Sequence, residues 1–348
     1  MARNKMNYID LCHGEFGRKV AYTGVSKITP ENVLKVIADT IGVHNRNRTM
    51  IDYLYRYYKG DQPILYREKL VRPEVNNRVV ENHALEVVKF KTGQIYGEPI
   101  QYVCKKKKAD KKINEQVDLL NDYLDEANAD ARNIQLGIYQ SAVGTAYKAI
   151  LREDDWTKGS DLPPFRIFIP YPGDVYIVYS RNTGKAMLSV QILKDEENQQ
   201  YYLCYSSNQY FKIKNGQVTV SGINGFGGIP IVEYPNNHDR LSDVEIAITA
   251  FDAINKYQSD RLNGVEQFIQ AFMKFKNCEV DENEFLKMVK LGAISVKDSG
   301  NGVQSDVDLM TAELNQSESQ VAKDDIYNNM LIVEAMPNRQ SNTGGDTG

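Results

Sequence analysis

The sequence has 348 residues, 25% of them charged and 42% hydrophobic, and its mean hydropathy of -0.49 is typical of a soluble globular protein with room for two or more domains. Its formal net charge of -4, from 42 basic and 46 acidic residues, excludes a global basic field that would recruit nucleic acid. No stretch approaches the length of an apolar membrane span and the N-terminus lacks the apolar segment of a signal peptide, so we expect a protein of the cytoplasm.

The first part of the chain has the spacing of apolar residues that predicts helices. Helices are expected over residues 29–41, 46–58, 79–99, 111–126 and 129–150. Thr29 and Pro30 supply an N-cap and a first helical position, and Gly42 is expected to end that helix. The stretch "IQYVC" (100–104) predicts a short strand.

A run of lysines follows, at 105–108 and 111–112. It has two interpretations, a local patch for nucleic acid and a solvated loop that leads into the next helix. The loop is the preferred interpretation, because charge runs of this length more often lie on a solvated surface.

From residue 165 to residue 235 the period changes to that of strands, with Pro, Gly and Asn-Gly between the runs. "KNGQ" (214–217) predicts a tight two-residue hairpin. Residues 1–238 are therefore expected to form one α+β domain, with helices first and an antiparallel sheet after.

A long helix is predicted to begin at residue 243 and to continue to about 272. Ser242 and Glu245 form a capping box, and an apolar stripe runs along one side of the helix. Its middle, "NKYQSDRLNG", is polar on most faces, which favours a helix that leaves its domain and packs on a neighbour. A short mixed segment over 270–312 and a second helix over 317–335 follow. We expect the two helices to lie antiparallel, with the mixed segment at their far end.

Sequence signatures of catalysis are missing. The chain has no G-x-x-x-x-G-K-[ST], no H-E-x-x-H and no G-x-S-x-G. Four cysteines and four histidines are scattered without metal-ligand spacing. We therefore expect no catalytic residue, no metal and no cofactor.

Three stretches carry a family resemblance: "RYYKGDQPILYR" (56–67), "NNRVVENHALEVVKFKTGQIYGEPIQYV" (76–103) and "GIPIVEYPNNHDRLSDVEIAITAFDAINKYQSD" (228–260). In this order they resemble the portal proteins of tailed bacteriophages, of the type found in siphophages of Gram-positive hosts. The resemblance implies a subunit of a dodecameric ring, the head-tail connector, at one capsid vertex. DNA passes through the axis of such a ring during packaging and ejection.

The resemblance also implies a division of the chain into family domains. Residues 1–238 are similar to the wing, 239–265 to the outgoing stem helix, 266–312 to an α/β clip, 313–336 to the returning stem helix and 337–348 to the start of the tunnel loop. The long helix and the crown that follow in the family are missing, so the resemblance implies a C-terminal truncation.

The family's partners follow from the same resemblance. They are further copies of the chain, double-stranded DNA bound without sequence preference, the large terminase subunit, a head-completion or adaptor protein, and the major capsid and scaffolding proteins. No membrane is implied. The resemblance places the protein at the portal vertex of the virion, and in the host cytoplasm during assembly.

Candidate residues follow from this mapping. The resemblance implies Lys323 and Arg339 as phosphate contacts in the DNA channel. The apolar stripe is expected to contribute to a subunit interface through Ile248, Phe251, Ile254, Ile326, Met330 and Val333. Clip lysines are expected to contribute to terminase docking at Lys274, Lys276, Lys287 and Lys290.

Two other functions remain open from the residues alone. One is a phage-encoded nuclease or hydrolase with an unrecognised site, which metal-dependent turnover of DNA would favour. The other is a different head adaptor, although such adaptors are usually much shorter.

Overall fold

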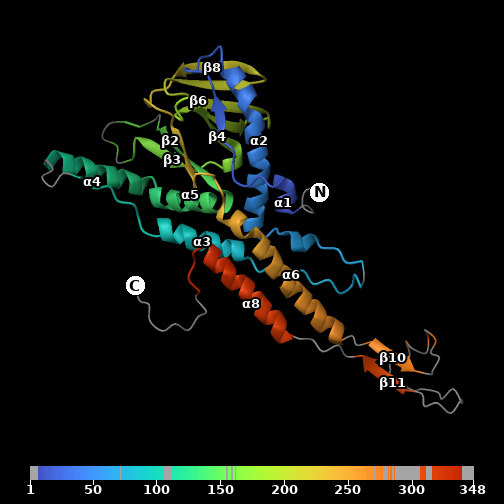
Figure 1. Ribbon diagram of the computed structural model, residues 1–348. Helices are drawn as coiled ribbons and strands as arrows, with labels where there is room; N and C mark the ends of the chain where they lie inside the picture. The colour runs from blue at the N-terminus through green and yellow to red at the C-terminus, as the bar shows by residue number, and fades with distance from the viewer. Residues whose placement is uncertain are drawn as a thin grey trace.

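A computed structural model describes residues 7–70, 72–105, 111–153, 156–157, 160, 162–269, 272–276, 281, 283, 286, 306–310 and 316–338. The body combines two β-sheets with packed helices, and a pair of helices projects from one end of it (Figure 1). Over the described residues, no helix is long and apolar enough to cross a membrane. This mixture of helices and largely antiparallel sheets is the α+β class expected from the sequence.

The larger sheet has six strands in the order β1-β4-β5-β6-β7-β8. Their bounds are β1 Ala21–Thr23, β4 Val175–Ser180, β5 Ala186–Lys194, β6 Gln200–Tyr205, β7 Gln209–Lys214 and β8 Gln217–Ile223. Only the β1–β4 pairing is parallel. The predicted hairpin between β7 and β8 is confirmed, with Asn215 and Gly216 both at positive φ, as a type I′ turn requires.

A smaller antiparallel sheet has the order β3-β2-β9 and connects the body to the projecting helices. Its strands are β2 Thr145–Arg152, β3 Phe165–Phe168 and β9 Ile231–Pro235. Because β9 ends eight residues before the long helix begins, this sheet fixes the point from which that helix leaves the body.

The helices are α1 Tyr8–Cys12, α2 Val33–Tyr58, α3 His83–Tyr96, α4 Lys111–Glu126, α5 Ala129–Val143, α6 Asp243–Ile269 and α8 Gln316–Val333, with 3-10 turns η2 Pro63–Tyr66 and η3 Pro172–Asp174. The first half of α2 packs Val33, Val36 and Ile37 on the larger sheet. Its second half contributes Ile51, Leu54 and other residues to a second core, shared with α3, α5, α6 and α8. Thus α2 ties the sheet to the root of the projecting helices.

The prediction that Gly42 ends a helix was wrong. The helix α2 continues through Gly42 without interruption. The glycine is exposed, and no atom lies within 4 Å of the position that a Cβ would occupy. An interior glycine costs a helix only about 1 kcal/mol. The two cores that α2 packs against at either end outweigh that cost.

The predicted helix over 129–150 was wrong in its second half, which forms strand β2. The break is at Gly144, whose φ of +84° ends α5. A Cβ on this glycine would lie 2.1 Å from the carbonyl oxygen of Arg240. The strand predicted over 100–104 is also absent, because the backbone of Tyr102 bonds the Asn121 side chain instead of another strand.

These two glycines give a matched test. Gly42→Ala should raise the free energy of unfolding by about 0.5–1 kcal/mol, because it removes only the helix penalty of glycine. Gly144→Ala should lower it by about 2 kcal/mol or more, because it adds left-handed strain and a clash with the backbone. Chemical denaturation measures both. If the two substitutions changed the free energy of unfolding equally and in the same direction, the assignment of the chain turn to Gly144 would be contradicted.

Candidate functional site

The candidate functional site is the pair of helices that projects from the body. Helices α6 and α8 run antiparallel: Arg261 of α6 bonds Gln320, and Gln258 accepts from Lys323 at 3.3 Å. Figure 1 shows the two helices side by side, which confirms the predicted pair. At their far end β10, Phe272–Lys276, pairs antiparallel with β11, Asp306–Met310. The rest of the predicted unit over 270–312 lies almost wholly outside the described residues.

The root of α6 is fixed by a buried carboxylate. The capping box is confirmed: the backbone N–H of Glu245 donates to Ser242 Oγ at 3.1 Å, and that of Ser242 donates to Glu245 Oε2 at 3.3 Å. Glu245 also forms an ion pair with Arg18 at 2.5 Å, with both side chains at 1% exposure or less. Tyr8 completes the group, donating to Glu245 at 2.5 Å and accepting from Arg18 at 2.8 Å.

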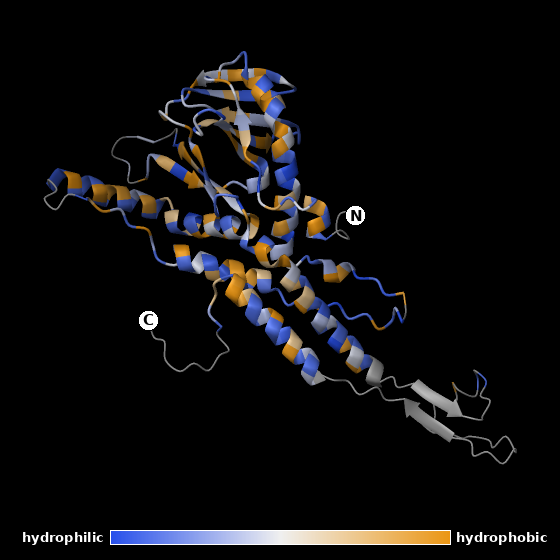
Figure 2. Ribbon diagram, viewed as in Figure 1, coloured by the Kyte–Doolittle hydropathy of each residue, from blue (hydrophilic) through white to orange (hydrophobic). Residues whose placement is uncertain are grey.

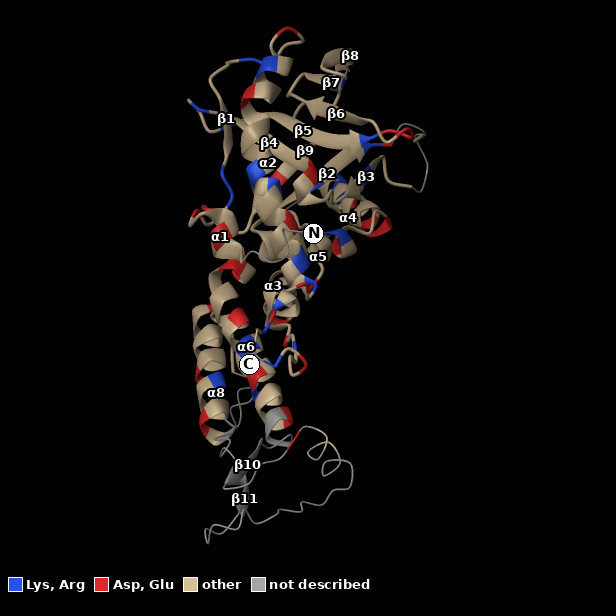
Figure 3. Cartoon of the chain, turned by 90° about the vertical axis from the view of Figure 1, so that its right-hand side faces the viewer, with Lys and Arg blue, Asp and Glu red and all other residues tan. Residues whose placement is uncertain are grey.

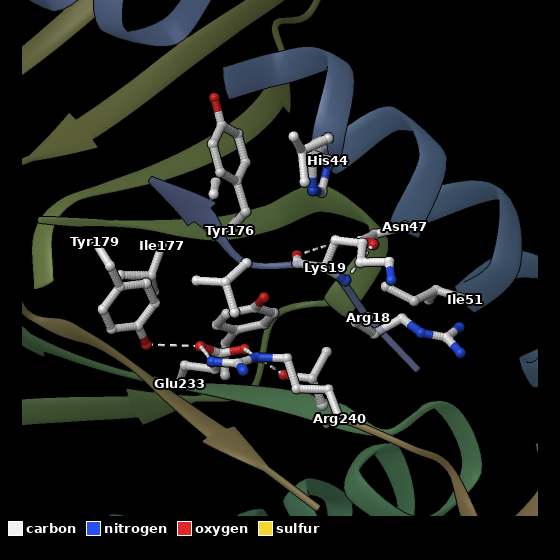
Figure 4. A pocket seen from close by; sticks show the side chains of 15 residues that line it. Arg18, Lys19, His44, Asn47, Ile51, Tyr176, Ile177, Tyr179, Glu233 and Arg240 are labelled. Atoms are coloured by element: carbon white, nitrogen blue, oxygen red, sulfur yellow. Dashed lines mark hydrogen bonds and ion pairs between the residues drawn. The ribbon is translucent and has the colours of Figure 1, made fainter. Parts of the chain in front are cut away.

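A second, partly buried ion pair lies between β9 and the segment that leads into the helix. Arg240 donates twice to Glu233 of β9, at 2.7 and 2.9 Å, and Tyr179 and Thr145 donate to the same carboxylate. Burial opposes ionisation of Glu233, but the Arg240 guanidinium outweighs it and holds the pKa below its usual range. Figure 4 shows this group at the wall of a narrow internal cavity.

Two titratable side chains that line the cavity in Figure 4, His44 and Glu233, are engaged in hydrogen bonds within the chain. The ring Nε2 of His44 lies 2.9 Å from the carbonyl oxygen of Gly173, and burial lowers the pKa of His44 to about 4, so the imidazole is neutral. The Glu233 carboxylate on its wall is committed to Arg240, Tyr179 and Thr145. Over the described part of the chain, no group of three or more His, Cys, Asp or Glu side chains is placed to hold a metal ion.

The polar middle of α6 contains a ladder of buried side chains. Asn255, Ser259 and Asn263 are 0%, 0% and 4% exposed. They accept from the backbone N–H groups of Glu81, Val79 and Asn77 at 2.8, 2.9 and 2.7 Å, respectively. We call residues 77–81 the strap, because this extended segment lies along α6 and is bonded to it at three levels.

The spacing of the ladder has a geometric cause. Four residues of helix rise about 6 Å, and two residues of extended chain advance about 6.6 Å. Every fourth side chain of α6 therefore meets every second N–H of the strap. The polar middle of α6 was expected to pack on a neighbour, and the structure shows that a segment of the same chain, the strap, covers its buried polar face.

Further contacts fix α8 against the same framework. Lys323 forms an ion pair with Glu81 of the strap at 2.6 Å, and Tyr327 donates to Glu86 of α3 at 3.1 Å. Where α8 ends, Lys91 of α3 contacts both the carboxylate and the backbone carbonyl of Glu334. The pair of helices is thus braced along its length as well as at its root.

Four of the six residues expected at a subunit interface are buried within the chain. Ile248, Phe251, Ile254 and Met330 are at most 2% exposed, and all except Ile254 belong to the chain's own core. Side chains buried in this way have no surface left for a second subunit. Ile326 is partly buried, and only Val333, at 62% exposure, remains open.

The predicted basic residues are not brought together among the described residues. Lys323 faces α6 and the strap, where Glu81 and Gln258 engage it. Lys274 and Lys276 lie in β10, where only the backbone is described, and Lys287, Lys290 and Arg339 fall outside the described residues. Figure 3 shows basic and acidic residues interspersed along α6 and α8.

Sequence reasoning missed the ladder, although a signal was present. Asn255, Ser259 and Asn263 recur every four residues, the same periodicity that marks a buried apolar stripe. By contrast, nothing in the sequence pairs Arg18 with Glu245, because the two residues are more than two hundred positions apart.

Removing one rung of the ladder should have a measurable cost. Ser259→Ala leaves the N–H of Val79 without its acceptor, so we expect the free energy of unfolding to fall by about 1 kcal/mol and the Val79 amide to exchange faster. Thr249→Ala removes an exposed hydroxyl from the same helix and should change neither quantity. Unchanged exchange at Val79 in the Ser259 variant would contradict the ladder.

Glu334 should make stability depend on pH. Burial, and then the charge of Asp243, raise its pKa from 4.5 to about 7, against the opposing charge of Lys91. The folded chain therefore binds this proton more tightly than the unfolded chain, and the stabilisation present below pH 4.5 is lost as the pH rises through 7. At pH 8, Glu334→Gln should be more stable than the parent protein. Between pH 4 and pH 8, the free energy of unfolding of the variant should rise by roughly 2–3 kcal/mol relative to that of the parent. Parallel pH profiles of unfolding for the two proteins would refute this.

Comparison with known proteins supplies the family. Residues 37–347 match the family described as "Phage portal protein, SPP1 Gp6-like". A curated relative, the portal protein of Bacillus phage SPP1, is 23% identical over 309 residues, which cover 79% of this chain and 56% of that protein. The chain thus spans little more than half the length of this relative.

Solved structures give a weaker likeness. The neck of a native GTA particle computed with C12 symmetry has a TM-score of 0.47 at 11% identity, and the neck of an empty GTA particle computed with C6 symmetry has 0.48 at 10%. Each covers 85% of this chain and 71% of the other. Because both scores are below 0.5, the assignment rests on the family match, which covers most of the sequence. The chain belongs to the SPP1 Gp6-like family of phage portal proteins.

Proposed function

We propose that the protein assembles into a ring at one capsid vertex and serves there as the conduit for DNA packaging and ejection. The observation that supports this most strongly is the family match, which runs through the body and the projecting helices alike. In this proposal residues 1–238 are the wing and 239–265 the outgoing stem helix. Residues 266–312 are the clip, 313–336 the returning stem helix and 337–348 the start of the tunnel loop.

The bracing of the helix pair supports a mechanical role. A clip held away from the wing must keep its position while DNA and partner proteins exert force on it. Buried hydrogen bonds at three levels of the strap, and a buried ion pair at the root, resist bending of α6. A loosely packed helix would not serve this purpose.

The charge balance also agrees with a conduit. A strongly basic bore would hold phosphates and slow DNA, whereas this chain has a net charge of -4 with both signs interspersed. We propose brief phosphate contact without base readout. Of the two cations proposed for it, Lys323 is held by Glu81, so the contact rests mainly on Arg339, beyond the described residues.

The proposed partners are the terminase large subunit and a head-completion or adaptor protein, docking at the clip. The lysines proposed to meet them are Lys274, Lys276, Lys287 and Lys290. The major capsid and scaffolding proteins would surround the wing.

Electron microscopy of the purified full-length protein tests the ring directly. We expect closed rings with a central opening, because a portal must pass duplex DNA. A protein that stays monomeric at all concentrations, or that cleaves DNA with a divalent metal, would overturn the proposal and favour a DNA-processing enzyme instead.

A packaging assay tests the two cations. Arg339→Ala should reduce the packaging rate or DNA retention, with an effect that weakens as salt rises. Lys323→Ala is compared with Glu81→Gln, which breaks the same ion pair but keeps the cation. Equal defects in those two variants would assign Lys323 to bracing alone, and normal packaging by Arg339→Ala would remove that residue from the channel.

A further inference from the structure

Helix α4 is the least covered element of the body. It projects from the body on the side away from α1 (Figure 1), and none of its residues is buried. Apolar residues nevertheless recur along it, as the colouring in Figure 2 shows. The backbone of Tyr102 is bonded at 3.0 Å in both directions by Asn121 of α4, which attaches the preceding segment to the helix. We call residues 98–105 together with α4 the arm.

The arm exposes an unusual amount of apolar surface. Ile113, Leu119 and Leu120 on α4 are 38%, 48% and 38% exposed, and Ile100, Tyr102 and Val103 beside it are 48%, 51% and 78% exposed. An isolated helix of this length is marginal in water, and helices in proteins draw most of their stability from packing an apolar face. An exposed apolar patch of this kind marks an interaction surface.

The charge of the arm selects its partner. Lys105, Lys111 and Lys112 lie before or at the start of α4, whereas residues 115–126, the rest of the helix, contain five acidic side chains and no basic one. Residues 45–59, in α2 and at its C-cap, contain the reverse balance, four basic side chains against one acidic. Arg48 is paired with Asp174 and Arg56 with Asp61, whereas Arg46 and Lys59 form no ion pair among the described residues. Between α1 and α2 lies an open hollow of about 280 Å³ with Leu11, Tyr53 and Tyr55 in its lining. A basic helix beside an aromatic hollow complements an acidic helix with exposed leucines.

The two surfaces lie on different sides of the body. Figure 1 places α4 and α1 at opposite sides at a similar height, and Figure 3, turned by 90°, keeps them at a similar height. Two complementary surfaces on different sides of one molecule form a head-to-tail contact, which generates a closed ring when the rotation permits. We propose that the arm of one copy docks between α1 and α2 of the next copy, with its leucines in the hollow and its carboxylates on Arg46 and Lys59. The inference rests on the proposed ring.

Two variants and their mixture test this contact by sedimentation velocity. The arm variant carries Leu119→Glu and Leu120→Glu; the receiver variant carries Arg46→Glu and Thr49→Trp, which reverses a charge and fills the hollow. Each should be monomeric alone. An equimolar mixture should form a dimer of about twice the monomer mass and nothing larger, because one intact contact remains between the two variants. The control Ile223→Glu alters an apolar residue that is 86% exposed outside the arm and should assemble as the parent does.

Photo-crosslinking of the otherwise unaltered protein keeps the test independent of folding in the variants. A photoreactive phenylalanine analogue at position 119 should crosslink to residues 8–12 or 45–59 of another copy. If both variants form rings as the parent does, or if the crosslinks join other parts of the two copies, the proposed contact is wrong. The proposed ring is not affected by either result. Crosslinks to a different capsid protein would make the arm a docking site for that protein instead. A parent that never assembles would remove both the contact and the proposed ring.

Discussion

The carboxylate of Glu245 is the constraint on which the rest of the arrangement depends. It lies at the first turn of α6, where the helix dipole and the free N–H groups favour a negative charge. There it accepts from Ser242 within the helix and from Tyr8, Gly17 and Arg18 outside it. Breaking such a buried pair by removing one partner typically costs about 3–5 kcal/mol. The N-terminal segment and the start of the long helix therefore meet at one fixed point.

Beyond Glu245, α6 is held first by apolar packing and then by hydrogen bonds. Its first two turns are buried by apolar side chains in the core shared with α2, α3 and α8. Beyond Asp252 the neighbours are no longer a core but an extended strap, and the contacts become hydrogen bonds to its backbone. This change explains why the face of α6 that meets the strap becomes polar while Asn255, Ser259 and Asn263 on it stay buried. An apolar surface there would have left the N–H groups of the strap without acceptors.

Local patterns in the sequence predicted much of the fold. Ser242 with Glu245, the Asn215-Gly216 turn and the two antiparallel helices are each determined by a few neighbouring residues, and all three were confirmed. The errors arose where distant residues decide the outcome. Gly42 stays helical because two cores hold α2, and Gly144 turns the chain because the backbone of Arg240 lies against it. Four residues of the α6 and α8 stripe, Ile248, Phe251, Ile254 and Met330, are covered by the chain itself, because amphipathic spacing predicts burial without identifying the surface that provides it.

The central claim is that the helix pair forms a rigid extension of the body. A distance distribution between spin labels at Thr183, in the turn between β4 and β5 of the larger sheet, and Ser317 at the start of α8, with Cys104 and Cys278 replaced by serine, tests it directly. Pulsed electron spin resonance should give one narrow distribution, which broadens when Glu245→Gln weakens the root. A broad or bimodal distribution in the protein with Glu245 intact would contradict the account.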